Sequence, residues 1–176
     1  AGPAAVLPGG RLTAEEAYAY SKFARVVLGT NDIDFRARPT SPEETAFLAA
    51  HVVLRGPDGT EPGVTYADLE RAKTVVLAGL EPEDEAGSIF LRLRKANRAG
   101  KTSVIAISPY TSRGSQKVKA RVIPTAPGDE AAALAALAID SEANLGADTV
   151  VLLGERLATS AGAFAAAVAL ADSTGA

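Results

Sequence analysis

Three short, mostly apolar runs stand out along the chain, at positions 75–78, 103–107 and 149–153. Each run is rich in β-branched residues and shows no alternation with polar ones, which is typical of a strand covered on both faces. Segments with helical spacing separate the runs. This order predicts an α/β fold, a mostly parallel sheet with helices on both faces and right-handed crossovers.

Capping residues mark where several helices begin. Thr13 is a good N-cap for a helix over 14–28, which Gly29 would end. Ser41 caps the next helix, and Pro42 suits its first position. Further helices are predicted within 65–72, 86–100, 129–140 and 160–176, and shorter strands within 4–10 and 121–128.

Composition narrows the class of protein. The 176 residues are 47% apolar, enough for a buried core, and no apolar run approaches the ~20 residues of a membrane span. The net charge of -3 does not favour nucleic acid as a partner. Because Cys is absent, disulfides, Cys-ligated metal sites and thiol catalysis are excluded within this chain. Met is absent as well, so we expect one excised α/β domain over 1–176, with 141–176 as an alternative sub-lobe.

The turn after the run at 75–78 carries the most conspicuous polar cluster. It contains four acids, Glu81, Glu83, Asp84 and Glu85. Ligands often bind where parallel strands end, and helix starts attract anions. A phosphate would meet like charges here, so acids that stabilise a helix dipole are the favoured interpretation over a cofactor site. The acids lack the alternating spacing of a calcium loop, so no metal site is predicted.

Other polar residues offer weaker candidates. His51 is the only His and has no G-x-S-x-G motif beside it, so we predict no catalytic residue. The basic run Arg113, Lys117, Lys119 and Arg121 is interpreted as a solvated face, with a nucleic-acid site as the alternative.

Longer segments resemble the molybdopterin oxidoreductase superfamily. The matching blocks begin with LTAEEAYAYSKFARVVLGTNDID, continue with the strand–turn–helix–strand segment TVVLAGLEPEDEAGSIFLRLRKANRAGKTSVIAISP, and end with VIPTAPGDEAAALAALA, in family order from Leu12 to Ala138. Within the superfamily the chain is most similar to the large iron–sulfur (G) subunits of bacterial NADH-quinone oxidoreductases. The resemblance implies a Rossmann-like domain of the formate dehydrogenase/DMSO reductase type.

The resemblance also says where a cofactor would bind. In cofactor-binding members, an Asn-Pro turn and an Asp-Pro turn help to hold a pterin guanine dinucleotide. The corresponding positions here lie in the Gly79–Glu81 turn, where Glu81 replaces Asn, and at Ser108, which replaces Asp; Asp32 replaces a second Asn of a G-T-N-N segment. We therefore expect a degenerate site at Gly79, Glu81 and Ser108 that binds no cofactor.

The resemblance carries further expectations about the parent protein. This segment would be a non-catalytic structural part of respiratory complex I, with iron–sulfur clusters held elsewhere in the parent subunit. Its partners would be the rest of that subunit and other peripheral-arm subunits, on the cytoplasmic side of the bacterial plasma membrane and without membrane insertion. The alternatives are a cofactor-binding fragment of a molybdopterin enzyme, and a small-molecule module with an apolar pocket beside Leu80 and Ile107.

Overall fold

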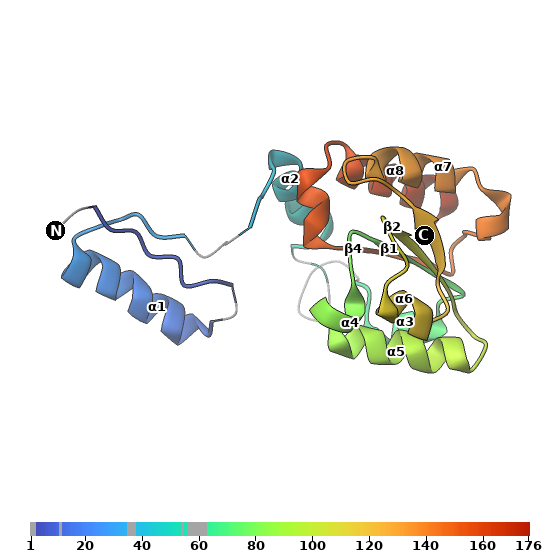
Figure 1. Ribbon diagram of the computed structural model, residues 1–176, viewed down its shortest axis with the longest axis horizontal. Coiled ribbons are helices and arrows are strands. Elements are labelled where there is room, and N and C mark those ends of the chain that lie inside the picture. Colours follow the sequence, from blue (N-terminus) through green and yellow to red (C-terminus); the bar gives the residue numbers. More distant parts are fainter. Residues whose placement is uncertain (1–2, 11, 35–37, 54, 56–62) are drawn as a thin grey trace. The chain divides into compact units, whose positions relative to one another are not determined.

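The computed structural model describes residues 3–10, 12–34, 38–53, 55 and 63–176. The chain forms two compact units, Ala1–Pro39 and Thr40–Ala176 (Figure 1). Within the described residues, no helix is both long and apolar enough to cross a membrane.

The smaller unit is built on one helix. Helix α1 spans Ala14–Phe23 and continues as a π-helical turn, η1, over Ala24–Leu28. Thr13 caps α1 in a capping box with Glu16, and Gly29 ends η1 with a φ of 66°, so both predicted ends of this helix are confirmed.

The strand predicted within 4–10 is wrong. Val6 forms a single parallel β-bridge with Ile33, and its N–H donates to Asp32 O at 2.9 Å. Pro8 has no N–H to extend a ladder. Ala24 is the only buried residue among those described in this unit, so its large apolar side chains are mostly exposed.

The larger unit contains a four-stranded, all-parallel sheet in the order β3–β2–β1–β4. The three apolar runs and the short strand near 121 are confirmed as its strands. Their bounds are Thr74–Ala78 for β1, Ser103–Ser108 for β2, Arg121–Pro124 for β3 and Thr149–Leu153 for β4. Because β4 pairs with β1, the segment 141–176 contributes a strand to this same sheet.

Helices follow or precede each strand. Their bounds are α2 Pro42–His51, α3 Tyr66–Arg71, α4 Pro82–Glu85, α5 Gly87–Arg98, α6 Arg113–Lys117, α7 Glu130–Ala138 and α8 Ala163–Thr174, with 3₁₀ turns η2 Ser141–Ala143 and η3 Glu155–Thr159. Ser41 caps α2 and Pro42 begins it, as predicted.

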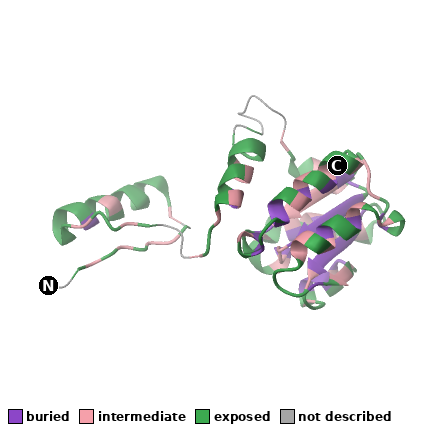
Figure 2. Ribbon diagram, turned by 90° about the horizontal axis from the view of Figure 1, so that it is seen from above, coloured by how far each residue is buried: buried purple, intermediate pink, exposed green. Residues whose placement is uncertain are grey.

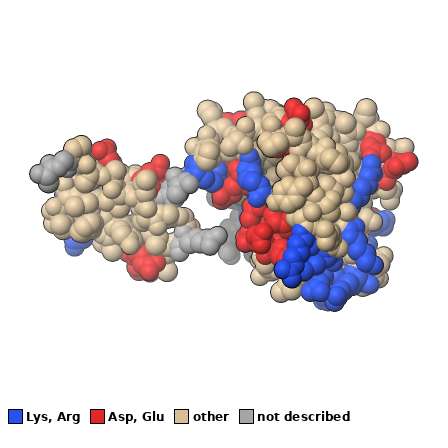
Figure 3. Space-filling model, in the orientation of Figure 1, with Lys and Arg blue, Asp and Glu red and all other residues tan. Residues whose placement is uncertain are grey.

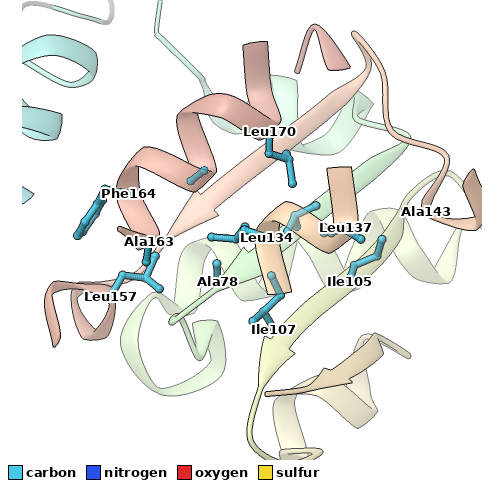
Figure 4. Close-up of a cluster of buried hydrophobic side chains, with 12 residues drawn as sticks. Ala78, Ile105, Ile107, Leu134, Leu137, Ala143, Leu157, Ala163, Phe164 and Leu170 are labelled. Carbon is cyan, nitrogen blue, oxygen red and sulfur yellow. The ribbon is translucent and has the colours of Figure 1, made fainter. Parts of the chain in front are cut away.

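Alternate residues of the central strands point to opposite layers, as the period of a strand requires. Helices α7 and α8 cover one face, where their side chains pack on those of β1 and β2 (Figure 4). Helix α5 covers the other face, together with residues from 118–122 (Figure 1). The buried residues therefore concentrate in the sheet between two helical layers (Figure 2).

Helix α5 offers a matched test of this packing. Leu93 is fully buried against the sheet, whereas Leu91 on the same helix is 62% exposed. We expect Leu93→Ala to lower the free energy of unfolding by about 2–5 kcal/mol, because it leaves a cavity. Leu91→Ala should change it by less than about 1 kcal/mol, since surface substitutions usually have small effects. Urea denaturation followed by circular dichroism measures both, and equal effects would contradict the layer assignment.

Candidate functional site

The carboxyl ends of β1 and β4 lie where the strand order reverses. The chain passes from β1 to β2 and β3 on one side, whereas β4 pairs with the other side of β1. The turn after β1 leads to α4 and α5, and the turn after β4 leads to η3 and α8 on the opposite face. Ligands of open parallel sheets bind at such a point. The candidate site is therefore formed by the residues that follow β1, β2 and β4.

The backbone closes the space between β1 and β4. Gly154 N donates to Ala78 O at 2.9 Å, and a Cβ atom added at Gly154 would overlap Gly79 O. A Cβ atom added at Gly79, where φ is 62°, would lie 2.8 Å from Leu157 Cγ. Leu157 is buried in the core beneath α8. Two glycines and one leucine are thus in close contact between the carboxyl ends of β1 and β4.

The acidic turn satisfies its own hydrogen-bond donors. Glu81 is the N-cap of α4, and its side chain accepts from Glu83 N at 3.3 Å. Glu85 Oε1 accepts from Glu81 N at 2.8 Å. A Cβ atom added at Gly114 would overlap Glu81 Oε1, so this carboxylate also lies against the start of α6. Two N–H groups of the turn, those of Glu81 and Glu83, are thus bound by carboxylates of the turn itself.

Cations from two other strand ends pair with these acids. Lys117 of α6 forms an ion pair with Glu83, and both side chains are about a quarter exposed, at 30% and 23%. Arg156 of η3 forms an ion pair with Glu85 at 2.5 Å. Asp84 is exposed. The turn after β1 is therefore tied electrostatically to the segments that follow β2 and β4.

Ser108 ends β2 beside this turn. Its hydroxyl donates to Tyr110 O at 3.0 Å, and its carbonyl oxygen accepts from Thr125 N at 3.1 Å. The side chain that replaces the expected Asp is thus used in the local turn. The structure brings Gly79, Glu81 and Ser108 to the same edge of the sheet, as the sequence predicts for neighbouring parallel strands.

Other predicted candidates lie away from this edge. His51 ends α2 and stacks on Phe47, with ring centroids 5.2 Å apart. It lines an apolar hollow of about 410 Å³ between α2 and α8. Asp32 belongs to the smaller unit, where its N–H donates to Thr30 Oγ1. In the part of the chain that the structure describes, no three His, Cys, Asp or Glu side chains are arranged to hold a metal ion.

The apolar pocket that a small-molecule module would need is not among the hollows described. Besides the hollow at His51, hollows of about 160 Å³ beside Asp148 and about 320 Å³ between α3 and α5 are described. None of these three is lined by Leu80 or Ile107, and Ile107 is buried under α7.

Sequence reasoning missed Gly154, Arg156 and Leu157. A signal was present, because the third apolar run ends in Gly154 as the first ends in Gly79. Two buried parallel strands that both end in Gly indicate a close backbone approach at that edge. No sequence pattern predicts that Arg156 pairs with Glu85, because Glu85 lies 71 residues earlier in the chain.

A family model described as molybdopterin oxidoreductase matches residues 2–176. This chain belongs to the molybdopterin oxidoreductase family. It is 52% identical to the G subunit of NADH-quinone oxidoreductase from Mycobacterium tuberculosis and from Mycobacterium bovis, over 99% of its length. It is 47% identical to the protein of the same name from Streptomyces coelicolor, again over 99% of its length. The chain spans 21–23% of the length of these curated relatives.

These similarities confirm the resemblance inferred from the sequence blocks and the α/β fold. The similarity extends beyond Ala138, where the recognised blocks ended, to Ala176. The last strand and helix therefore belong to the same family segment as the first blocks.

The close approach at Gly154 can be tested with a matched glycine. Gly154→Ala should lower the free energy of unfolding by about 1–3 kcal/mol or more, because the methyl group must displace the backbone at Gly79. Gly146→Ala has open space around its Cβ position, so its effect should stay within about 1 kcal/mol. Thermal and urea denaturation measure both variants. Equal stability of the two would show that the strand ends are not in contact.

Proposed function

We propose that this chain is a non-catalytic structural segment of the G subunit of an NADH-quinone oxidoreductase. It would retain a molybdopterin-type scaffold and support electron transfer from NADH to quinone by the parent complex, whose iron–sulfur clusters would lie outside this segment. The absence of Cys supports this division of labour, because the segment cannot ligate such clusters through thiolates.

One observation carries the proposal: carboxylates of the acidic turn accept hydrogen bonds from backbone N–H groups of the same turn. The residues do not fit a dinucleotide diphosphate, which would have to displace the carboxylates of Glu81 and Glu85 from backbone N–H groups. Four carboxylates face two cations there, so the turn keeps a net negative charge. Each like-charge contact at ~4 Å costs about 1 kcal/mol even in water. Leu157 and the glycine backbones occupy the remaining space.

The parent complex supplies the proposed location and partners. A component of a quinone-linked oxidoreductase works beside other subunits at a membrane, so we place this segment in the peripheral arm, on the cytoplasmic side of the bacterial plasma membrane. The rest of the parent subunit and neighbouring subunits are its proposed partners. The alternative, a fragment that binds a molybdopterin guanine dinucleotide, requires the opposite result in the following experiment.

Metal and nucleotide analysis tests the proposal. The purified, folded chain should contain molybdenum and tungsten far below one atom per molecule by mass spectrometry, and should release no guanine nucleotide on denaturation. Titration with GDP, which carries the guanine and diphosphate groups, should give no saturable heat.

Two variants show whether any observed heat comes from GDP binding at the acidic turn. Glu81→Gln removes a carboxylate from the turn, whereas Glu142→Gln removes an exposed acid from η2. Saturable GDP binding that Glu81→Gln strengthens and Glu142→Gln leaves unchanged would place a nucleotide site at the turn and overturn the proposal.

A further inference from the structure

Helix α5 carries cations on two sides, and only those on one side form ion pairs with described residues. On the side that faces α3, Arg92 and Lys95 pair with Glu70, at 2.5 Å and 2.9 Å. The hydrogen bond from Lys95, and then that from Arg92, hold the pKa of Glu70 below its ordinary value. Arg92 also lies over the ring of Tyr66, with its Cζ 4.7 Å from the centroid. Both cations on this side of α5 therefore have a carboxylate partner.

The other side of α5 has no such partner among the described residues. Arg94 and Arg98 are four residues apart, so they lie on one side of the helix. Arg94 also follows Phe90 by four residues, and Phe90 packs in the core that contains Val118. Neither arginine forms an ion pair with a described residue. Within the described part of the chain, two cations on the α6 side of α5 are therefore left without counter-charge.

Two lysines extend this surface along the amino edge of the sheet. Lys101 lies two residues before β2, and Lys119 lies two residues before β3. Because β2 and β3 pair in parallel, both lysines reach the same edge of adjacent strands. Both are exposed, and neither forms an ion pair within the described chain. We name Arg94, Arg98, Lys101 and Lys119 the basic face.

Two acids of this edge already have counter-charges of their own. Asp140 pairs with Arg121 at 2.5 Å, and Asp148 pairs with Lys73 at 2.5 Å. Lys and Arg gather over the lower part of the larger unit, where α5 and α6 lie, in the space-filling view (Figure 3).

Arg94 also has a hydrogen-bond donor that lacks a partner among the described residues. Its Nε atom is buried and has no hydrogen-bond partner among the described residues. The residue as a whole is only half-buried. Guanidinium groups suit bidentate binding of a carboxylate.

We propose that the basic face docks an acidic protein surface of the same enzyme that lies outside this segment. The inference rests on the proposed function, because it takes the partner to be a neighbouring segment or subunit of the oxidoreductase. Charge complementarity between patches of this size guides association and orientation. An acidic protein fits better than nucleic acid, because the chain carries a net charge of -3 and the acids of α4 lie on the same layer as α5.

Carbodiimide cross-linking of the assembled enzyme tests the docking directly. This reagent joins a lysine amine to a carboxylate that it touches, without a spacer. We expect peptides in which Lys101 or Lys119 is joined to an Asp or Glu of another segment or subunit. If both lysines instead react with an amine-acylating reagent as completely in the enzyme as in the isolated chain, they are exposed and the inference is wrong.

Charge reversal tests the same surface with a matched control. In the assembled enzyme, Arg98→Glu with Lys101→Glu should lower the salt concentration at which this subunit dissociates by at least twofold. Arg71→Glu with Lys95→Glu makes the same change in net charge on the α3 side, where it removes the ion pairs of Arg71 with Asp68 and of Lys95 with Glu70. This control should dissociate like the wild type, and equal effects of the two double variants would contradict the proposed face.

The isolated chain distinguishes the other classes of partner. It should bind neither mixed-sequence double-stranded DNA nor vesicles of phosphatidylglycerol at about 0.15 M salt, where the Debye length is about 8 Å. Binding to either one that Arg98→Glu with Lys101→Glu abolishes would overturn the inference. Molybdenum in the purified chain would contradict the proposed function and leave the cross-links unaffected, so the two failures are distinguishable.

Discussion

The carboxyl edge of the sheet depends on one interaction, the binding of backbone N–H groups by the carboxylates of the same turn. The first N–H groups of any helix lack partners within the helix and must find an acceptor elsewhere. In α4 that acceptor is Glu81, and Glu85 in turn binds Glu81 N. These N–H groups of the turn therefore have acceptors within the chain.

Long-range ion pairs and apolar packing coincide at this edge. Glu83 and Glu85 draw cations from α6 and η3, and the arginine of η3 is followed directly by Leu157 in the core. Half-buried pairs such as Lys117 and Glu83 leave a costly uncompensated charge when one partner is removed. Opening the crevice for a ligand would thus require breaking ion pairs and moving a buried leucine together. This coupling favours a structural over a binding role for the edge.

The sequence predicted the sheet well because its strands are continuous apolar runs, a pattern that two covering layers require. Helices that begin with a clear N-cap residue, such as the one after Thr13, were predicted equally well. The prediction of a strand at 4–10 was wrong because an apolar run does not show whether a neighbouring strand is present. Among the described residues, Val6 forms a β-bridge only with Ile33. Of the site, the acidic turn and Ser108 could be located from strand order. The pairing of Glu85 with Arg156 could not, since only the folded sheet brings β1 beside β4.

The acidic turn at the carboxyl edge of the sheet and the basic face differ in how their charged side chains are paired. At the carboxyl edge, two of the four acids of the turn pair with cations of the same chain. On α5, Glu70 pairs with both cations of the side that faces α3, but neither Arg94 nor Arg98 forms an ion pair with a described residue. Unpaired surface cations contribute little to the stability of an isolated domain. Their concentration beside the half-buried Arg94 is explained by an acidic surface of a partner, whose carboxylates would pair with these cations.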